Sequence, residues 1–176
     1  FETEWGYSCM GYEISGALGI KMAKPDQEVI VFIGDGSYLL NNSDIYSSIL
    51  YEKKLIIVVC DNSGHMVINR LQLAKGGKEY LCNLKAARAK NFIEVDFAAH
   101  AASMGAETET VISTSELEAA FLRAKKSNKT YVIALKTHGY EWLEGTAFWE
   151  SPTLEVSSTD NNKKAYQEHK EGKEKQ

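Results

Sequence analysis

Two clusters of small polar residues stand where two apolar segments of the chain end. The first cluster, residues 34–37, reads GDGS, and the second cluster, residues 61–64, reads DNSG. Asp35 offers a carboxylate oxygen, Asn62 offers an amide oxygen, and a glycine at position 64 lets the backbone turn its carbonyl inward. Mg²⁺ takes oxygen ligands of these kinds, and water and phosphate oxygens complete its octahedron when protein ligands are few.

The first cluster also offers groups that suit a phosphate. Gly36 allows a close approach to its backbone N–H, and Ser37 adds a hydroxyl near an expected helix start, where anions are favoured. A lone GDG at the end of a strand is most often an ordinary turn. The pairing of GDG with DNSG, with a helix expected between them, instead indicates a phosphate or diphosphate site bridged by Mg²⁺.

The elements that must position these clusters are read from apolar patterning. β-Branched or apolar runs predict buried strands at 28–34, 54–60 and 130–137, and a shorter strand is expected at 107–113. Helical spacing predicts helices at 10–27, 41–53, 95–105 and 113–127, with Ser43 as the N-cap of the second and Ser113 or Ser115 as the N-cap of the last. This alternation predicts an α/β fold, a doubly wound and mainly parallel sheet with helices on both faces.

Two segments break the alternation. Residues 63–89 are punctuated by glycines and are expected to form an irregular, functional loop. Residues 151–176 are polar and highly charged, and we expect either a solvated helix or a frayed tail there. The expected organisation is therefore a binding domain over 1–150 and a charged C-terminal tail over 151–176.

The composition is that of an ordinary globular protein. The chain has 176 residues, of which 44% are hydrophobic and 25% are charged, and its net charge of −4 disfavours nucleic-acid and anionic-membrane partners. No apolar stretch approaches the length that spans a bilayer. The three cysteines lack zinc-like spacing and favour a reducing, cytoplasmic location. A start without methionine suggests a piece of a longer polypeptide.

The paired clusters resemble the thiamine diphosphate (ThDP) binding motif, in which GDG is followed by a helix, a strand and a terminal Asn. The resemblance implies that Mg²⁺ is held by the Asp35 and Asn62 side chains and by the Gly64 carbonyl. Asp61 departs from the motif, which usually has a second Asn there. The cofactor-binding residues implied within and after the clusters are Gly34, Gly36, Ser37, Asn62, Gly64 and the backbone of His65 and Met66.

A segment upstream, YSCMGYEISGALG, is similar to a stretch of the acetolactate synthase and pyruvate oxidase group. That resemblance implies that Met10 is an apolar wedge that bends the cofactor. It also implies that the carbonyl of Ser8 holds the 4′-amino group of the cofactor, although the group usually has Gly at that position. Taken alone, Met10 would be read as an ordinary core methionine at a helix start.

Longer stretches resemble the trihydroxycyclohexanedione hydrolases of myo-inositol catabolism, which belong to the same superfamily. The matching segments are residues 4–23 and 34–45, followed by AFWES at 147–151. The resemblance implies a ThDP- and Mg²⁺-dependent enzyme that opens the ring of trihydroxycyclohexane-1,2-dione by hydrolysis. It also implies that this chain is the C-terminal, diphosphate-binding third of that enzyme, without its N-terminal pyrimidine-binding and middle domains.

The same resemblance leaves the chain without a catalytic residue of its own. In the superfamily, the glutamate that activates the cofactor comes from the pyrimidine-binding domain of a neighbouring subunit, which implies a homodimer or homotetramer. Isolated, the chain is expected to be inactive. Of the histidines, His65 and His138 could face a substrate or phosphate, whereas His100 reads as structural and His169 as solvated.

Other interpretations stay open at this point. One is a ThDP enzyme that is acetolactate synthase-like or decarboxylating and acts on a 2-oxo acid. Another is a non-catalytic ThDP-binding or assembly module. A nucleotide-binding α/β domain is disfavoured, because Gly11, Gly16 and Gly19 follow no expected strand and their spacing differs from G-x-G-x-x-G.

Overall fold

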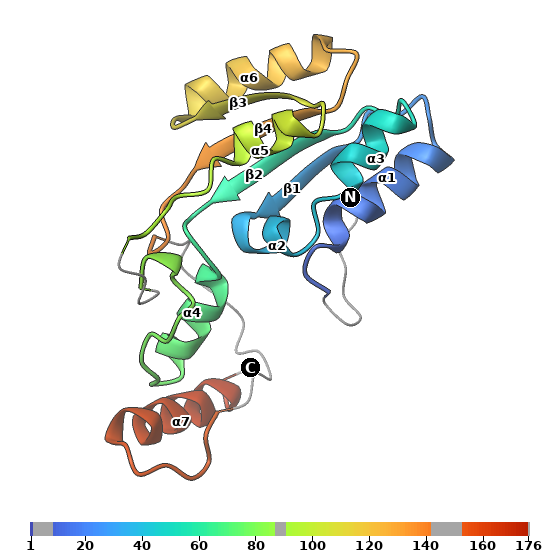
Figure 1. Ribbon diagram of the computed structural model, residues 1–176. Helices are drawn as coiled ribbons and strands as arrows, with labels where there is room; N and C mark the ends of the chain where they lie inside the picture. The colour runs from blue at the N-terminus through green and yellow to red at the C-terminus, as the bar shows by residue number, and fades with distance from the viewer. Residues whose placement is uncertain (2–8, 87–90, 142–152, 176) are drawn as a thin grey trace. The chain divides into compact units, whose positions relative to one another are not determined.

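The computed structural model describes residues 1, 9–86, 91–141 and 153–175 (Figure 1). The chain folds into two compact units. The first comprises residues 1–64 and 91–137 and contains the sheet, and the second comprises residues 65–90 and 138–176.

A four-stranded parallel sheet forms the centre of the first unit, within the described residues (Figure 1). Its strands lie in the order β1-β2-β4-β3, and every neighbouring pair is parallel. Strand β2 is apolar along both faces, as expected of a strand that is covered on each side. The strand bounds are β1 Ile30–Gly34, β2 Ile56–Asp61, β3 Glu107–Val111 and β4 Tyr131–Lys136.

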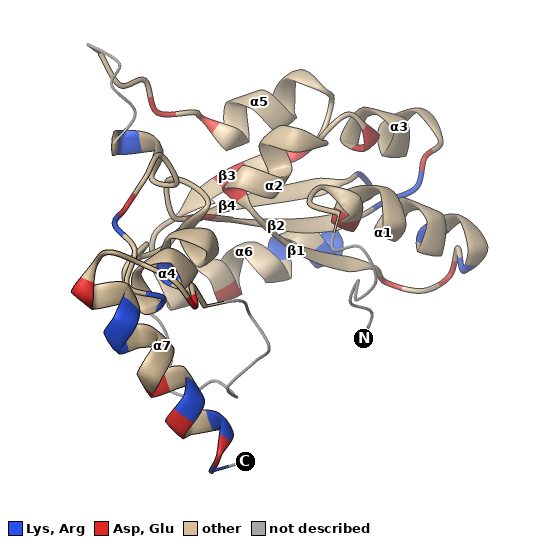
Figure 2. Ribbon diagram, turned by 90° about the horizontal axis from the view of Figure 1, so that it is seen from below, with Lys and Arg blue, Asp and Glu red and all other residues tan. Residues whose placement is uncertain are grey.

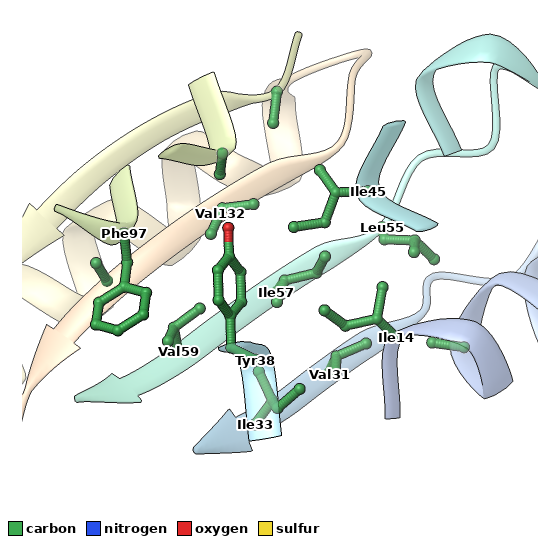
Figure 3. Packing of buried hydrophobic residues seen from close by; sticks show 14 of the residues in the cluster. Ile14, Val31, Ile33, Tyr38, Ile45, Leu55, Ile57, Val59, Phe97 and Val132 are labelled. Carbon is green, nitrogen blue, oxygen red and sulfur yellow. The ribbon is translucent and has the colours of Figure 1, made fainter. Parts of the chain in front are cut away.

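One face of the sheet is covered by a group of helices whose apolar residues form the larger core cluster (Figure 3). Ile57 and Val59 of β2 point to this face, where they meet Ile14 and Tyr38 from the helices. The helices of this face are α1 Tyr12–Ala23, α2 Asp35–Leu40, α3 Asp44–Leu50 and α5 Phe97–Ser103.

The opposite face carries α6, Thr114–Lys126. Ile56 and Val58 of β2 point to this side and pack in a second cluster with Ala120 and Ala124 of α6. Successive residues of β2 therefore serve opposite faces, as the pleat of a strand requires. The predicted doubly wound α/β fold with helices on both faces is confirmed.

The predicted helix starts fare differently. Ser113 is the N-cap of α6, and its hydroxyl accepts a hydrogen bond from the Glu116 N–H at 3.3 Å. Ser43 occupies the predicted N-cap position of α3, but its side chain makes no capping hydrogen bond and its backbone is already helical. Asp96, which was not predicted as a cap, is the N-cap of α5, and its side chain accepts a hydrogen bond from the Ala99 N–H at 2.9 Å.

The second unit corrects the prediction of an irregular loop over 63–89. A helix, α4 Met66–Ala74, occupies the first part of that segment, and a 3₁₀ turn, η1 Leu84–Ala86, occupies its end. The charged tail contains α7 Asp160–Lys173, whose acidic and basic residues alternate along the helix (Figure 2). Among the described residues, no helix is long and apolar enough to cross a bilayer.

Within the second unit, side chains tie the irregular segments to the helices. Asn162 of α7 donates through Nδ2 to the carbonyl of Lys75 at 2.8 Å. Glu79 accepts two hydrogen bonds on Oε1, from Asn69 at 2.6 Å and from the Tyr140 hydroxyl at 2.7 Å. These bonds anchor residues 75–79 and the segment that follows β4 to α4 and α7.

Candidate functional site

The two polar clusters lie at the carboxyl edge of the sheet, in the first unit. Strands β1 and β2 are neighbours in parallel register, and Gly34 at the end of β1 pairs with Cys60 near the end of β2. Asp35 therefore starts α2 beside the turn that begins at Asp61. The sequence-predicted convergence of the two clusters follows from this register, since the carboxyl ends of adjacent parallel strands meet at one edge.

Asp35 is the buried acid of this edge, with a side chain that is almost completely enclosed. The residue is 1% exposed, and its Oδ2 accepts a hydrogen bond from the Gly64 N–H at 2.7 Å. Burial raises the pKa of the Asp35 carboxyl, and the nearby charge of Asp61 raises it further, while backbone N–H bonds oppose the shift. A cation placed here would relieve the cost of burying this carboxylate.

The Asn62 amide lies against the other two predicted metal ligands. One terminal atom of the amide is 3.1 Å from Asp35 Oδ1 and 2.8 Å from the Gly64 carbonyl oxygen. As nitrogen, this atom donates hydrogen bonds to both oxygens. Rotating the amide by half a turn puts its oxygen there instead, and carboxylate, amide and carbonyl oxygens then converge.

This arrangement suits a magnesium ion. Oxygen ligands about 2.1 Å from Mg²⁺ in an octahedron are about 3 Å from their neighbours, which matches the 3.1 Å and 2.8 Å separations around Asn62. Within the described ranges, no group of three or more His, Cys, Asp and Glu side chains could hold a metal. The donor set is thus one of hard oxygens with a single carboxylate, which leaves room for phosphate oxygens.

The short helix α2 is anchored in the core just after the GDGS cluster. Tyr38 is fully buried and meets the Phe97 ring edge-on, with ring centroids 5.3 Å apart (Figure 3). Its hydroxyl forms a 2.8 Å hydrogen bond with Nδ1 of His100, and burial raises the Tyr38 pKa to about 12. His100 therefore acts structurally, and the Tyr38 anchor holds the turn that carries Asp35.

The upstream residues are only partly placed. Ser8 lies outside the described residues, whereas Met10 is described and is 43% exposed. Gly11 follows with φ +94°, a left-handed conformation, and a Cβ at Gly11 would lie 2.7 Å from the Asn41 Cβ. The chain thus needs glycine at this bend, which presents Met10 at the start of α1.

The predicted diphosphate-lining residues differ in their present partners. Ser37 is half-buried on α2. His65 precedes α4, and its backbone N–H already donates to the Cys82 carbonyl at 2.8 Å. Met66, the first residue of α4, is buried, and His138 is exposed two residues beyond β4.

Lys136 was not predicted from the sequence as a residue of this edge. Its Nζ donates to Asp61 Oδ2 at 2.5 Å, from the carboxyl end of β4, and hydrogen bonding to Asp61 raises the Lys136 pKa. The available signal was a charged residue near the end of the buried strand predicted at 130–137, a position like those of Asp35 and Asn62.

A family model matches most of the chain. The model described as thiamine pyrophosphate enzyme, C-terminal TPP binding domain, matches residues 1–135.

Curated relatives match over nearly the whole chain. A 3D-(3,5/4)-trihydroxycyclohexane-1,2-dione hydrolase of Halalkalibacterium halodurans is 39% identical over 173 residues, covering 95% of this chain and 26% of the relative. The hydrolase of the same name from Bacillus subtilis is 38% identical over 173 residues, with coverages of 95% and 26%. The chain spans about a quarter of the length of these relatives.

A solved structure shares the fold. The ThDP-dependent 4-hydroxybenzoylformate decarboxylase of Rhodococcus jostii RHA1 superposes with a TM-score of 0.61 at 21% sequence identity. The match covers 73% of this chain and 23% of the decarboxylase, and at this identity it supports the fold alone.

Proposed function

Because the chain belongs to the thiamine pyrophosphate enzymes, as a C-terminal TPP-binding domain, we propose that Asp35, Asn62 and Gly64 hold a Mg²⁺ ion against the diphosphate of ThDP. The observation that carries this proposal is the convergence of three oxygen-bearing groups at separations suited to octahedral coordination. In the metal-bound state, the Asn62 amide presents its oxygen, and the Asp35 carboxylate supplies the only negative charge among the protein ligands.

Further residues around this centre would bind the rest of the cofactor. Gly34 and Gly36 allow a close backbone approach, and Ser37 offers its hydroxyl to a phosphate oxygen. The His65 N–H can reach a phosphate only if it leaves the Cys82 carbonyl, to which it now donates. The remaining cofactor-binding residues in the proposal are the carbonyl of Ser8, the side chain of Met10 and the backbone of Met66.

We propose that the protein containing this chain is a ThDP-dependent enzyme that hydrolyses trihydroxycyclohexane-1,2-dione with ring opening. The relatives that match 95% of the chain carry the name of that hydrolase. Bound ThDP supplies stabilisation of a carbanion formed from a carbonyl substrate. The residues of this chain contribute by binding the metal, orienting the diphosphate and, through the Met10 side chain, bending the cofactor.

The domain organisation belongs to the same proposal. Residues 1–150 form the diphosphate- and Mg²⁺-binding domain, and residues 151–176 form a charged C-terminal tail. A pyrimidine-binding domain of a neighbouring subunit supplies the activating glutamate, so the enzyme works as a homodimer or homotetramer in the cytoplasm. The chain alone is therefore expected to be inactive.

An assay of the full-length polypeptide that carries this chain tests the proposal. The trihydroxycyclohexane-1,2-dione and pyruvate are supplied in turn, with and without ThDP and Mg²⁺, and the products are identified by mass spectrometry. The proposal predicts the ring-opened acid from the dione only when ThDP and Mg²⁺ are present. Turnover of pyruvate but not of the dione would contradict the proposal. Hydrolysis of the dione that persists without ThDP would also contradict it.

A further inference from the structure

Asp61 stands where the ThDP motif usually has a neutral Asn, and both oxygens of its carboxylate are engaged. Oδ1 accepts a hydrogen bond from the Ser63 N–H at 3.1 Å, and Oδ2 accepts one from Lys136 Nζ at 2.5 Å. The Asp61 side chain is 6% exposed, whereas that of Lys136 is 40% exposed. An enclosed carboxylate thus has one backbone partner and one cationic partner.

The backbone partner, the Ser63 N–H, belongs to a turn whose conformation is energetically unfavourable for a residue other than glycine. Ser63 has φ +66° and Gly64 has φ +148°, so the chain passes through the left-handed region at a residue with a side chain. The Asp61 bond to the Ser63 N–H holds this turn. This turn also positions the Asn62 amide and lets the Gly64 N–H donate to Asp35.

A neutral Asn at position 61 could make the same bond to the Ser63 N–H, because its amide oxygen is also an acceptor. A carboxylate adds a buried negative charge, and that charge already acts on Asp35. Burying such a charge is costly unless a cation pairs with it. Lys136 is the residue directly opposite Asp61 in the β2–β4 register, and Glu94, at 3.8 Å from its Nζ, is a more distant acidic neighbour.

We propose that Lys136 is a positioning residue for the metal and diphosphate site. Its ammonium neutralises Asp61 and keeps that carboxylate on the Ser63 N–H, so that the turn presents Asn62 and Gly64 to the metal. Asp61 and Lys136 together then do what a neutral Asn does alone in the usual motif. This inference rests on the proposed function, because it assigns the pair to the same Mg²⁺ and diphosphate site.

Substitutions in the full-length polypeptide separate this role from a general contribution to folding. Lys136→Met leaves the Asp61 charge without its cation. Asp61→Asn combined with Lys136→Met removes both charges but keeps an acceptor for the Ser63 N–H. Asp61→Ala combined with Lys136→Met removes both charges and the acceptor. Arg123→Met, which breaks the ion pair between Arg123 of α6 and Glu109 of β3, is the matched control.

Two measurements are made on each variant. Calorimetry gives the ThDP affinity at saturating Mg²⁺, and hydrogen exchange of peptides spanning residues 60–66 gives the stability of the turn without cofactor. The second measurement needs no cofactor binding. It therefore tests the pair even if wild-type protein fails to bind ThDP, an outcome that would overturn the proposed function.

Lys136→Met is expected to weaken ThDP binding by about tenfold and to speed exchange in the turn by about tenfold, since a half-exposed ion pair lies between the surface and buried cases. Asp61→Asn combined with Lys136→Met should restore both values to within about threefold of wild type. Asp61→Ala combined with Lys136→Met should not restore them. Arg123→Met should change neither. The inference is overturned if Lys136→Met behaves as wild type in the exchange measurement. It is also overturned if Asp61→Asn combined with Lys136→Met exchanges as fast as Lys136→Met.

Discussion

The two edges of the sheet carry charged residues in different ways. At the carboxyl edge, Asp35 is buried and the Asn62 amide and Gly64 carbonyl converge on it. At the amino edge, a cavity of about 190 Å³ is lined by Lys21, Asp26, Glu28, Val29, Lys54 and Ile56. The carboxyl edge gathers oxygen-bearing groups around a buried acid, whereas the amino edge contains a cavity lined by charged side chains.

The lysines of the amino edge are already engaged. Lys21 Nζ donates to the carbonyls of Pro25 and Gln27 at 2.7 Å and 2.6 Å, and Lys54 Nζ donates to the Lys125 carbonyl at 2.9 Å. The Lys21 bonds tie α1 to the loop before β1, and the Lys54 bond ties the last turn of α6 to the segment before β2. A cavity therefore marks a function less reliably than a cluster of polar groups whose burial is costly without a ligand.

The largest expected effect is at the carboxyl edge. Asp35→Ala removes the only charged ligand of the proposed Mg²⁺ site, and ThDP affinity at saturating Mg²⁺ should fall by at least about 100-fold, as measured by calorimetry. Asp26→Ala, an exposed acid of the amino edge, is the matched control and should bind as wild type. Equal losses in the two variants would remove the distinction between the edges.

Two glycines of α1 and its N-cap should respond in opposite ways to an added side chain. Gly11 lies at the carboxyl edge with φ +94° and meets Asn41, so Gly11→Ala should lower the free energy of unfolding by about 1–3 kcal/mol. Gly19 faces open space further along α1, and Gly19→Ala should raise that free energy by roughly 0.5–1 kcal/mol. Urea denaturation measures both, and a stabilising Gly11→Ala would show that the bend tolerates a side chain.

An ion pair between α6 and the middle residue of β3 gives a baseline away from the carboxyl and amino ends of the strands. The Arg123 guanidinium and the Tyr131 hydroxyl bond to Glu109, whose side chain is 22% exposed, and the Arg123 bond chiefly holds the Glu109 pKa below its ordinary value. Glu109→Gln should cost up to about 1 kcal/mol of unfolding free energy at neutral pH.

The pH dependence of that cost has a definite sign. Because the folded-state pKa of Glu109 is lowered, its contribution is complete above the unfolded pKa and is lost as pH falls through the folded pKa. Wild type and Glu109→Gln should therefore converge in urea denaturation as the pH is lowered below the ordinary carboxyl range. A difference that stays constant through acid would mean that the Glu109 charge is not its source.

The smallest effect is expected at the amino edge. Lys54→Met removes an ammonium from the cavity, and ThDP affinity measured by calorimetry should stay within about twofold of wild type, because distant sites act independently. A tenfold change in affinity would show that the cavity is coupled to cofactor binding. The two edges would then no longer be functionally separate.

The convergence of Asp35 with Asn62 and Gly64 could be predicted from the sequence because it follows from local rules. Each cluster comes directly after a strand, and neighbouring parallel strands end at the same edge. The link between Asp61 and Lys136 could not be predicted in this way. It depends on β4 pairing with β2 rather than with β1, a choice set by packing between distant segments.

Helix α4 was missed for a different reason. It buries Met66 and Asn69 while Val67 and Ile68 are exposed, so its apolar residues do not mark an inward face. Periodicity then gives no helical signal, and the glycines that follow favour a loop. The prediction of a ThDP-binding C-terminal domain did not depend on this segment, and the family match over residues 1–135 confirms it.

The central claim is that the oxygens of Asp35, Asn62 and Gly64 join ThDP to the protein through Mg²⁺. A calorimetric titration of the full-length wild-type protein with ThDP, once with saturating Mg²⁺ and once with EDTA, tests it most directly. The account predicts binding with Mg²⁺ and an affinity at least about 100-fold weaker in EDTA, because the diphosphate then faces the uncompensated Asp35 carboxylate. Equal affinities under the two conditions would contradict it.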